Sequence, residues 1–478
     1  MEKLNKKYGL FTAICMVVGI VIGSGIFFKA KDVLASANGN ALHSIIAWVI
    51  SGSIMVAIAT TFAVLATKYE KVNGVVDYAE ATCGGTYAYM IGWFLSMIYY
   101  PALTSVLAWV SARYTLVLFG YIEAPLFDLD GSLASSMNSP ECITLALIYL
   151  VFAYFLNTLA PKVAGKFQIS STAAKLVPIA FIALVGTVVG LVNGNLVGNF
   201  DLSAIDVGAI SSPAERTGLF PAICSTIFAY EGWIVATSIN SEIKDSKKNL
   251  PIALCVGTVI IMLAYTLYNV GILGLANIID VTNEGTTVAF SFFGGAVAAI
   301  INVFVVVSCL GTLNGLMLGC CRGVYSLSAR REGISPEVFS QIDKKTDMPH
   351  NSCTFALFMC ALWFGYFIFA GGGFVPWDGV NEYGFDSSEL PIITVYPLYV
   401  PILVVMMIKE KDLHPVKRFV LPSISILGVC LIVSASIVKH GMDNVWYLIL
   451  FAVVMAIGAL VLYFNKRRDK SVVEKTVE

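Results

Sequence analysis

Long apolar runs occupy most of the chain, and we count about twelve of them. Each approaches or exceeds the roughly 20 apolar residues that a helix needs to cross a bilayer. The runs are continuous and lack the alternation of apolar and polar residues that membrane β-strands show. The pattern therefore predicts an all-α polytopic membrane protein with about 12 transmembrane helices. The runs cover residues 10–34, 42–67, 86–119, 143–160, 170–193, 218–241, 251–276, 290–322, 353–371, 390–408, 420–438 and 444–464.

The first run is weakened at its midpoint. It contains the stretch VIGSGIF, residues 21–27, with Gly23, Ser24 and Gly25 at its centre. Glycine weakens a helix by about 1 kcal/mol per residue relative to alanine. One explanation is close helix packing, because Gly19 and Gly23 form a small-xxx-small pair. The other is a deliberate interruption of the spanning helix.

The sixth run has a comparable weak point, in the stretch FAYEGW, residues 228–233. Here Glu231 and Gly232 lie at the middle of an apolar span. Interrupted helices at matching positions in two halves are typical of transporters built from inverted repeats. Such breaks expose backbone amides and carbonyls, which bind the charged ends of a substrate. The two interruptions, five spans apart, therefore favour a transporter.

Composition excludes a soluble globular protein. The chain is 58% hydrophobic and 13% charged, whereas soluble domains carry about 25% charged residues. If the N-terminus is cytoplasmic, 24 of the 30 Lys and Arg residues lie in cytoplasmic segments. The positive-inside rule predicts this bias, so we expect both termini in the cytoplasm. Five basic residues lie in external loops: Lys29, Lys31, Arg113, Arg216 and Lys439.

One basic and one acidic residue, Lys175 and Glu231, are left deep within the spans. A charge at the centre of a membrane helix costs about 2.5–3.5 kcal/mol, and such residues usually mark ion or substrate pathways. The alternative is a structural ion pair, or a side chain that reaches to the interface. We favour the functional interpretation for both residues.

The sequence contains no sign of other chemistry. No GxxxxGK[ST] loop is present, so nothing indicates an ATP-driven pump. The four histidines are scattered, and no Cys/His cluster has metal-site spacing. The eleven cysteines lie mostly within spans and do not form a disulfide framework. We therefore expect no catalytic residues, no metal, no cofactor and no bound nucleic acid.

Four segments resemble the amino acid–polyamine–organocation (APC) superfamily of transporters, and within it the L-type amino acid transporter branch. VIGSGIF is similar to the interrupted first helix of that family, and TAAKL to its fifth helix. FAYEGW followed by EIKDSKKNLP is similar to the sixth helix and the following loop. SCLGTLNG running on to SARREGISP is similar to the eighth helix and an inner loop. The segments lie at residues 21–27, 172–176, 228–251 and 308–336.

This resemblance implies a LeuT-type fold of 5+5 inverted repeats with interrupted helices 1 and 6. Residues 1–193 would hold spans 1–5, and residues 194–408 would hold spans 6–10. Residues 409–465 would form two peripheral spans, and residues 466–478 a cytoplasmic tail.

The resemblance also implies a substrate site and an ion-site substitute. The substrate carboxylate would lie on the amides of Gly23, Ser24 and Gly25, and its amino group on carbonyls near Val21, Phe228 and Glu231. Phe228 would be an aromatic gate over the substrate. Lys175 matches a lysine that stands where sodium-coupled relatives bind an ion, with Ser308 as its hydroxyl neighbour on the eighth span. In the L-type branch a small residue often stands where this chain has Glu231.

We therefore expect a sodium-independent secondary transporter of amino acids in the plasma membrane, working by exchange or proton coupling. Small neutral amino acids are the first expected substrates, and Glu231 makes cationic amino acids or polyamines the alternative. An amino-acid receptor on a transporter fold is a second alternative, and an ion channel is disfavoured because no filter sequence is present. The surroundings of Cys142 do not resemble the heavy-chain cysteine motif, so we expect no disulfide-linked heavy chain.

Overall fold

The structure, a computed structural model, is built from α-helices, with short 3-10 and π-helical turns and no strand in the described part of the chain. It describes residues 9–23, 25–69, 74–122, 139–201, 206–210, 214, 216–237, 243–372 and 385–477. Ser24 lies outside the described residues, as does most of the segment between the third and fourth spans.

Ten helical segments of the described chain are long and apolar enough to cross a membrane. An eleventh crossing is a pair of helices, α1 (Leu10–Val21) and α2 (Gly25–Ser36), bent by 46°. The predicted all-α membrane architecture is therefore confirmed. Seven of the ten segments are single helices: α3 (Ala41–Lys68), α8 (Pro140–Leu159), α14 (Ser246–Leu275), α17 (Gly295–Ser328), α19 (His350–Gly372), α20 (Leu390–Lys409) and α22 (Asp443–Val477). The other three are helices that continue through a π-helical turn: α5 (Gly85–Phe94) with η1 (Leu95–Tyr99) and α6 (Tyr100–Ile122), α9 (Pro161–Phe181) with η2 (Ile182–Gly186) and α10 (Thr187–Val192), and η6 (Val416–Val420) with α21 (Leu421–His440).

The predicted sixth span differs from a regular membrane helix. It consists of α12 (Leu219–Thr226), a 3-10 turn η4 (Ile227–Tyr230) and the five-residue α13 (Trp233–Thr237). None of these pieces is long enough to cross a bilayer alone, since a crossing takes about 20 residues. The interruption predicted at Glu231–Gly232 is present, and it divides the span into two short pieces.

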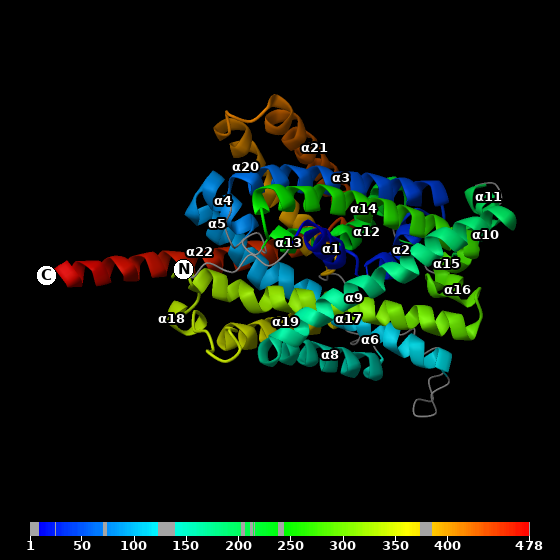
Figure 1. Cartoon of the computed structure of the whole chain (residues 1–478), viewed down its shortest axis with the longest axis horizontal. Helices are drawn as coiled ribbons and strands as arrows, with labels where there is room; N and C mark the ends of the chain where they lie inside the picture. The colour runs from blue at the N-terminus through cyan, green and yellow to red at the C-terminus, as the bar shows by residue number, and fades with distance from the viewer. Residues whose placement is uncertain are drawn as a thin grey trace.

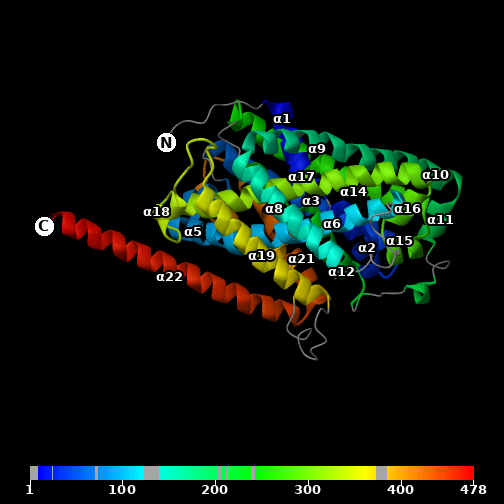
Figure 2. The same ribbon diagram turned by 90° about the horizontal axis from the view of Figure 1, so that it is seen from below.

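The helices pack around the two broken spans. In Figure 1, α3 and α14 run side by side along one face, while α17 lies with α6, α8 and α19 on the other. The first helix, α1, lies between them and contacts α14, α9, α13 and α17. Figure 2 shows α22 along the outside of the bundle, projecting past one end. Since its outer faces are exposed and apolar, the bundle presents the surface expected toward lipid.

The two ends of the bundle are distinguished by their short helices. One end, here the α18 end, carries α4 (Val75–Cys83), α18 (Pro336–Phe339) and the projecting part of α22. The other, here the α15 end, carries α11 (Asn195–Phe200), α15 (Ile278–Glu284) and α16 (Thr287–Ser291).

Helix starts follow local rules. The α8 helix begins where the Ser139 hydroxyl accepts a hydrogen bond from the Cys142 amide, with Pro140 at the first helical position. The α3 helix begins where the Asn40 side chain accepts from the His43 amide.

Two helical segments touch through their backbones. A Cβ atom on Gly186 or Gly190 would fall on the backbone of Gly271 or Gly274 in α14. In return, a Cβ atom on Gly271 would fall on the backbone of Ile182 and Ala183, and one on Gly274 on the backbone of Gly186. Small residues allow this close approach, which is one of the main sources of association between membrane helices.

Candidate functional site

The first helix break joins two helices that end toward each other. The α1 helix ends at Val21 and α2 begins at Gly25. The amides of the first turn of α2 have no partner within the helix, and the last carbonyls of α1 likewise face outward. The predicted binding residues Gly23 and Gly25 are buried at this break. Backbone polar groups are therefore presented at mid-span, as the sequence predicted.

The two glycines also have a packing role. A Cβ atom on Gly25 would lie 2.5 Å from the Cα of Ala229, and one on Gly23 would lie 2.5 Å from Oγ1 of Thr312. Because Ala229 belongs to η4, the break in the first span touches the break in the sixth. Packing and binding explanations therefore apply to the same residues.

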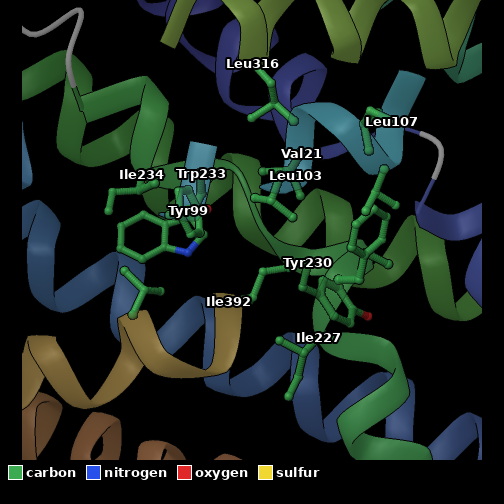
Figure 3. Close-up of a cluster of buried hydrophobic side chains, with 14 of the residues drawn as sticks. Val21, Tyr99, Leu103, Leu107, Ile227, Tyr230, Trp233, Ile234, Leu316 and Ile392 are labelled. Carbon is green, nitrogen blue, oxygen red and sulfur yellow. The ribbon is translucent and has the colours of Figure 1, made fainter. Parts of the chain in front are cut away.

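The second break follows from the backbone at two residues. Glu231 is extended, with φ −87° and ψ 162°, and Gly232 has φ +107°. A positive φ of this size is open to glycine and strained for other residues, so Gly232 lets the chain turn between η4 and α13. Figure 3 shows side chains of η4 and α13 meeting those of α1, α6, α17 and α20 around this point, among them Val21, Tyr230 and Trp233.

Glu231 lies buried with both of its carboxylate oxygens occupied. Tyr99 donates a hydrogen bond to Oε1 at 2.6 Å, and Tyr396 donates to Oε2 at 2.9 Å. Tyr99 belongs to the π-helical turn η1, and Tyr396 belongs to α20. Among the described residues no lysine or arginine forms an ion pair with this carboxylate. Neither tyrosine could be predicted from the residues around Glu231, since both lie in other spans.

Lys175 is fully buried and reaches across to the first span. Its ammonium donates to the carbonyl of Gly19 at 2.8 Å and to Oγ1 of Thr312 at 2.9 Å. Gly19 lies half a turn before the end of α1, so the ammonium supports the helix close to its break. The hydroxyl partner is Thr312, one turn beyond the predicted Ser308. Ser308 is buried, and its hydroxyl has no hydrogen-bond partner in the described chain.

Two more predicted residues border the break. The Val21 carbonyl accepts a hydrogen bond from the Tyr265 hydroxyl at 3.1 Å, which leaves the second lone pair of that oxygen. Phe228 is buried and lies edge-to-face against Phe28, with ring centroids 6.2 Å apart. The ammonium of Lys29 lies 5.7 Å from the centre of the Phe228 ring.

An aromatic layer continues from Phe228 toward the α15 end. Phe28 packs against Trp109 at 5.6 Å, and Trp109 packs against Phe367 at 5.5 Å. Arg113 lies 5.5 Å from the Trp109 ring, as a cation over an aromatic face. This layer adjoins both breaks, since Phe28 belongs to α2 and Phe228 to η4.

Beside that layer lies a buried ionic cluster that the sequence analysis missed. Glu389 is fully buried and its Oε1 pairs with Lys29 at 2.7 Å. Its Oε2 pairs with Lys439 at 2.8 Å and lies 3.0 Å from Nε2 of His440. Lys175 and Glu231 are therefore joined by two further buried charges, Lys29 and Glu389. The signal that could have found Lys29 is its position inside the first apolar run.

Membrane-crossing helices, two mid-span breaks in contact and ionisable side chains buried beside them define a secondary membrane transporter as the class of this protein. The chain belongs to the amino acid permease family, whose sequence model matches residues 8–461. This family assignment confirms the predicted resemblance.

Curated relatives cover nearly the whole chain. The serine/threonine exchanger SteT of Bacillus subtilis is 25% identical over 98% of both chains. The b(0,+)-type amino acid transporter 1 of Mus musculus is 27% identical, over 96% of this chain and 88% of its own. The human cystine/glutamate transporter is 28% identical, over 73% of this chain and 65% of its own.

Proposed function

We propose that this protein is a sodium-independent secondary transporter that moves small neutral amino acids by alternating access, through exchange or proton coupling. The observation that carries the proposal is the contact between the two helix breaks, where Gly25 meets Ala229. The family and the functions of its relatives, which include a serine/threonine exchanger, support amino acids as the substrate class.

In this proposal the break in the first span binds the ends of the amino acid. The substrate carboxylate lies on the amides of Gly23, Ser24 and Gly25, where the α2 dipole favours a negative charge. The amino group lies on carbonyls at Val21 and in the second break, near Phe228 and Glu231. Phe228, packed under Phe28, is the aromatic gate.

Lys175 takes the place of a coupled sodium ion. Its ammonium already donates hydrogen bonds to a carbonyl of α1 and a hydroxyl of α17, the oxygen ligands that a bound cation would otherwise use. A cationic ammonium at this point leaves no need for sodium. Ser308, one turn away with an unpartnered hydroxyl, is a second group that the ammonium can reach when α1 moves.

Glu231 is the residue that bears on whether the substrate is a neutral amino acid or a cationic amino acid or polyamine. Its oxygens are engaged by two tyrosine hydroxyls, which satisfies the carboxylate without a substrate cation and favours a neutral amino acid. The absence of an ion-pair partner within the described residues favours the alternative, a cationic amino acid or polyamine. Uptake competition between serine and arginine separates the two.

We propose inverted repeats at residues 1–193 and 194–408, with residues 409–465 peripheral. Helix α22 runs on through the predicted tail to Val477. The α18 end is assigned to the cytoplasm and the protein to the plasma membrane, from the distribution of basic residues. Cys142 is 2% exposed, which supports the proposal that no heavy chain is attached through it.

The test is transport by the purified protein in liposomes. Liposomes loaded with unlabelled serine should accumulate labelled serine, with or without sodium outside. A matched set with a proton gradient separates exchange from proton coupling. If amino acids raise the melting temperature of the protein and labelled serine enters neither by exchange nor under a proton gradient, the protein is a receptor and the proposal is wrong. Full dependence on sodium would also overturn it.

A further inference from the structure

Three metal-ligating side chains from three helices meet at the α15 end. Cys224 lies in α12, Glu389 directly precedes α20, and His440 is the last residue of α21. Their ligand atoms all lie within 4.8 Å of one another. Cys224 and Glu389 are fully buried, and 6% of the His440 side chain is exposed. No residue of this group takes part in the proposed substrate site.

Two of the three spacings among these atoms are close to those of a tetrahedral zinc ion. With Zn–S near 2.3 Å and Zn–O near 2.1 Å, the sulfur and oxygen of such a site lie about 3.6 Å apart, and a nitrogen and oxygen about 3.4 Å apart. Sγ of Cys224 is 3.6 Å from Oε2 of Glu389, and Nε2 of His440 is 3.0 Å from the same oxygen. One edge of the tetrahedron is already formed, and the imidazole needs to withdraw by only a few tenths of an ångström.

Two ammonium groups compete for the same carboxylate. Lys29 bonds Oε1 at 2.7 Å and leaves Oε2 free for a metal, so it can stay. Lys439 lies 2.8 Å from Oε2 and 2.9 Å from Oε1, so it must move. Its side chain lies in the last turn of α21 and is 18% exposed. A lysine at a helix end can extend its ammonium to the aqueous interface, and here it gives up its bonds to Glu389 and to the Ser225 hydroxyl when it does so.

We propose that Cys224, Glu389 and His440 form a binding site for Zn²⁺ or another thiophilic divalent cation, with Lys439 as the competing cation. Binding releases the thiol proton of Cys224, because the metal takes the thiolate. A water molecule completes the fourth position, as in open zinc sites. The bound ion ties α12, which leads into the second break, to α20 and α21. It therefore holds the α15 end closed and inhibits transport.

Cobalt supplies a readout that does not depend on transport. The full-length protein is purified in detergent without a polyhistidine tag and titrated with Co²⁺. We expect one ion per chain, with a thiolate-to-cobalt charge-transfer band that Zn²⁺ abolishes. Cys224→Ser should remove the band. Outer-shell changes already lower metal affinity about 10–100-fold, so removal of the imidazole in His440→Ala should lower it by at least about tenfold.

Lys439→Met gives the discriminating result. It removes the ammonium that the metal must displace from the Glu389 carboxylate. That attraction at 2.8 Å corresponds to about tenfold even at the dielectric constant of water, so affinity should rise by at least about tenfold. Cys430→Ser and His414→Ala are the matched controls, because they remove the same kinds of ligand from exposed positions elsewhere, and they should change nothing. The proposal is overturned if the band survives in Cys224→Ser, or if Lys439→Met binds no more tightly than the wild type.

The inhibition itself rests on the proposed transport function and is tested separately. Zn²⁺ should slow exchange in liposomes of the wild type and leave Cys224→Ser unaffected. If cobalt binds as expected and no substrate is exchanged, the site stands while the transport proposal fails. If exchange occurs and Zn²⁺ binds without slowing it, the site stands and its role as a lock is wrong.

Discussion

Replacing Glu389 with glutamine removes the carboxylate charge that Lys29 and Lys439 share. The Lys29 side chain is 3% exposed, so its ammonium cannot recover hydration in place. The Lys29 ammonium also lies 3.3 Å from a carboxylate oxygen of Asp32. The Asp32 side chain is 40% exposed, so water screens that attraction. Removing one partner of a buried ion pair costs about 3–5 kcal/mol, because the other charge is left uncompensated. We expect Glu389→Gln to lower the free energy of unfolding by an amount in this range.

The assay is reversible unfolding in mixed micelles with increasing SDS, followed by the loss of helical circular dichroism. The double variant Lys29→Met/Glu389→Gln removes both charges, so it should be more stable than the sum of the two single changes predicts. A coupling free energy of about 1–3 kcal/mol is expected for residues in contact. Asp412→Asn is the matched control. It also removes a lysine partner, that of Lys68, but its side chain is 71% exposed, and such pairs contribute about 0–1 kcal/mol.

Two outcomes would refute this reasoning. One is a Glu389→Gln protein within about 1 kcal/mol of the wild type, like the surface control. The other is a double variant whose loss equals the sum of the single losses. Either would mean that the two ammonium groups are neutralised elsewhere or hydrated in place.

Three further changes test the proposed substrate site. Gly25→Ala should destabilise the protein by about 1–3 kcal/mol and weaken substrate binding, because the added Cβ atom meets the backbone of Ala229. The control is Gly165→Ala, which has open space around it and should unfold no more easily than the wild type. Lys175→Ala should slow exchange more than it weakens binding in a thermal-shift titration, and equal losses in both would contradict a role in the transport cycle. Glu231→Gln should keep affinity for a neutral amino acid but lose any stimulation by a proton gradient, and lost affinity for arginine with no change for serine would establish the cationic alternative.

The features that depend on local sequence were predictable. Apolar runs, mid-span glycines and an isolated lysine are visible in short windows, so the helical membrane fold, both breaks and the burial of Lys175 followed from them. The hydroxyl partner of Lys175 was placed one turn too early, at Ser308 instead of Thr312. Residues one turn apart share a helix face, so face alone does not separate them.

Pairings across the bundle were not predictable. Lys29 and Glu389 are 360 residues apart, and nothing in either neighbourhood indicates the other. Charge counting places Lys29 in an external loop, although it lies inside the first apolar run, and its partner is visible only in the folded structure. The hydrogen bonds from Tyr99 and Tyr396 to Glu231 were unpredictable for the same reason. A polar side chain in an apolar span has many possible partners, and only the folded structure shows which of them it contacts.

Four glycines bring α10 and the turn before it against α14, and they limit which substitutions the protein can tolerate. Every amino-acid change reachable from a glycine codon adds at least a Cβ atom, and at Gly186, Gly190, Gly271 and Gly274 that atom would fall on a neighbouring backbone. A backbone cannot rotate away as a side chain can, so one substitution cannot be rescued by repacking its partner. The lipid-facing apolar residues of the same helices can exchange among leucine, valine and isoleucine freely. Random mutagenesis of this protein should therefore recover variants along the outer faces and leave this narrow seam unchanged.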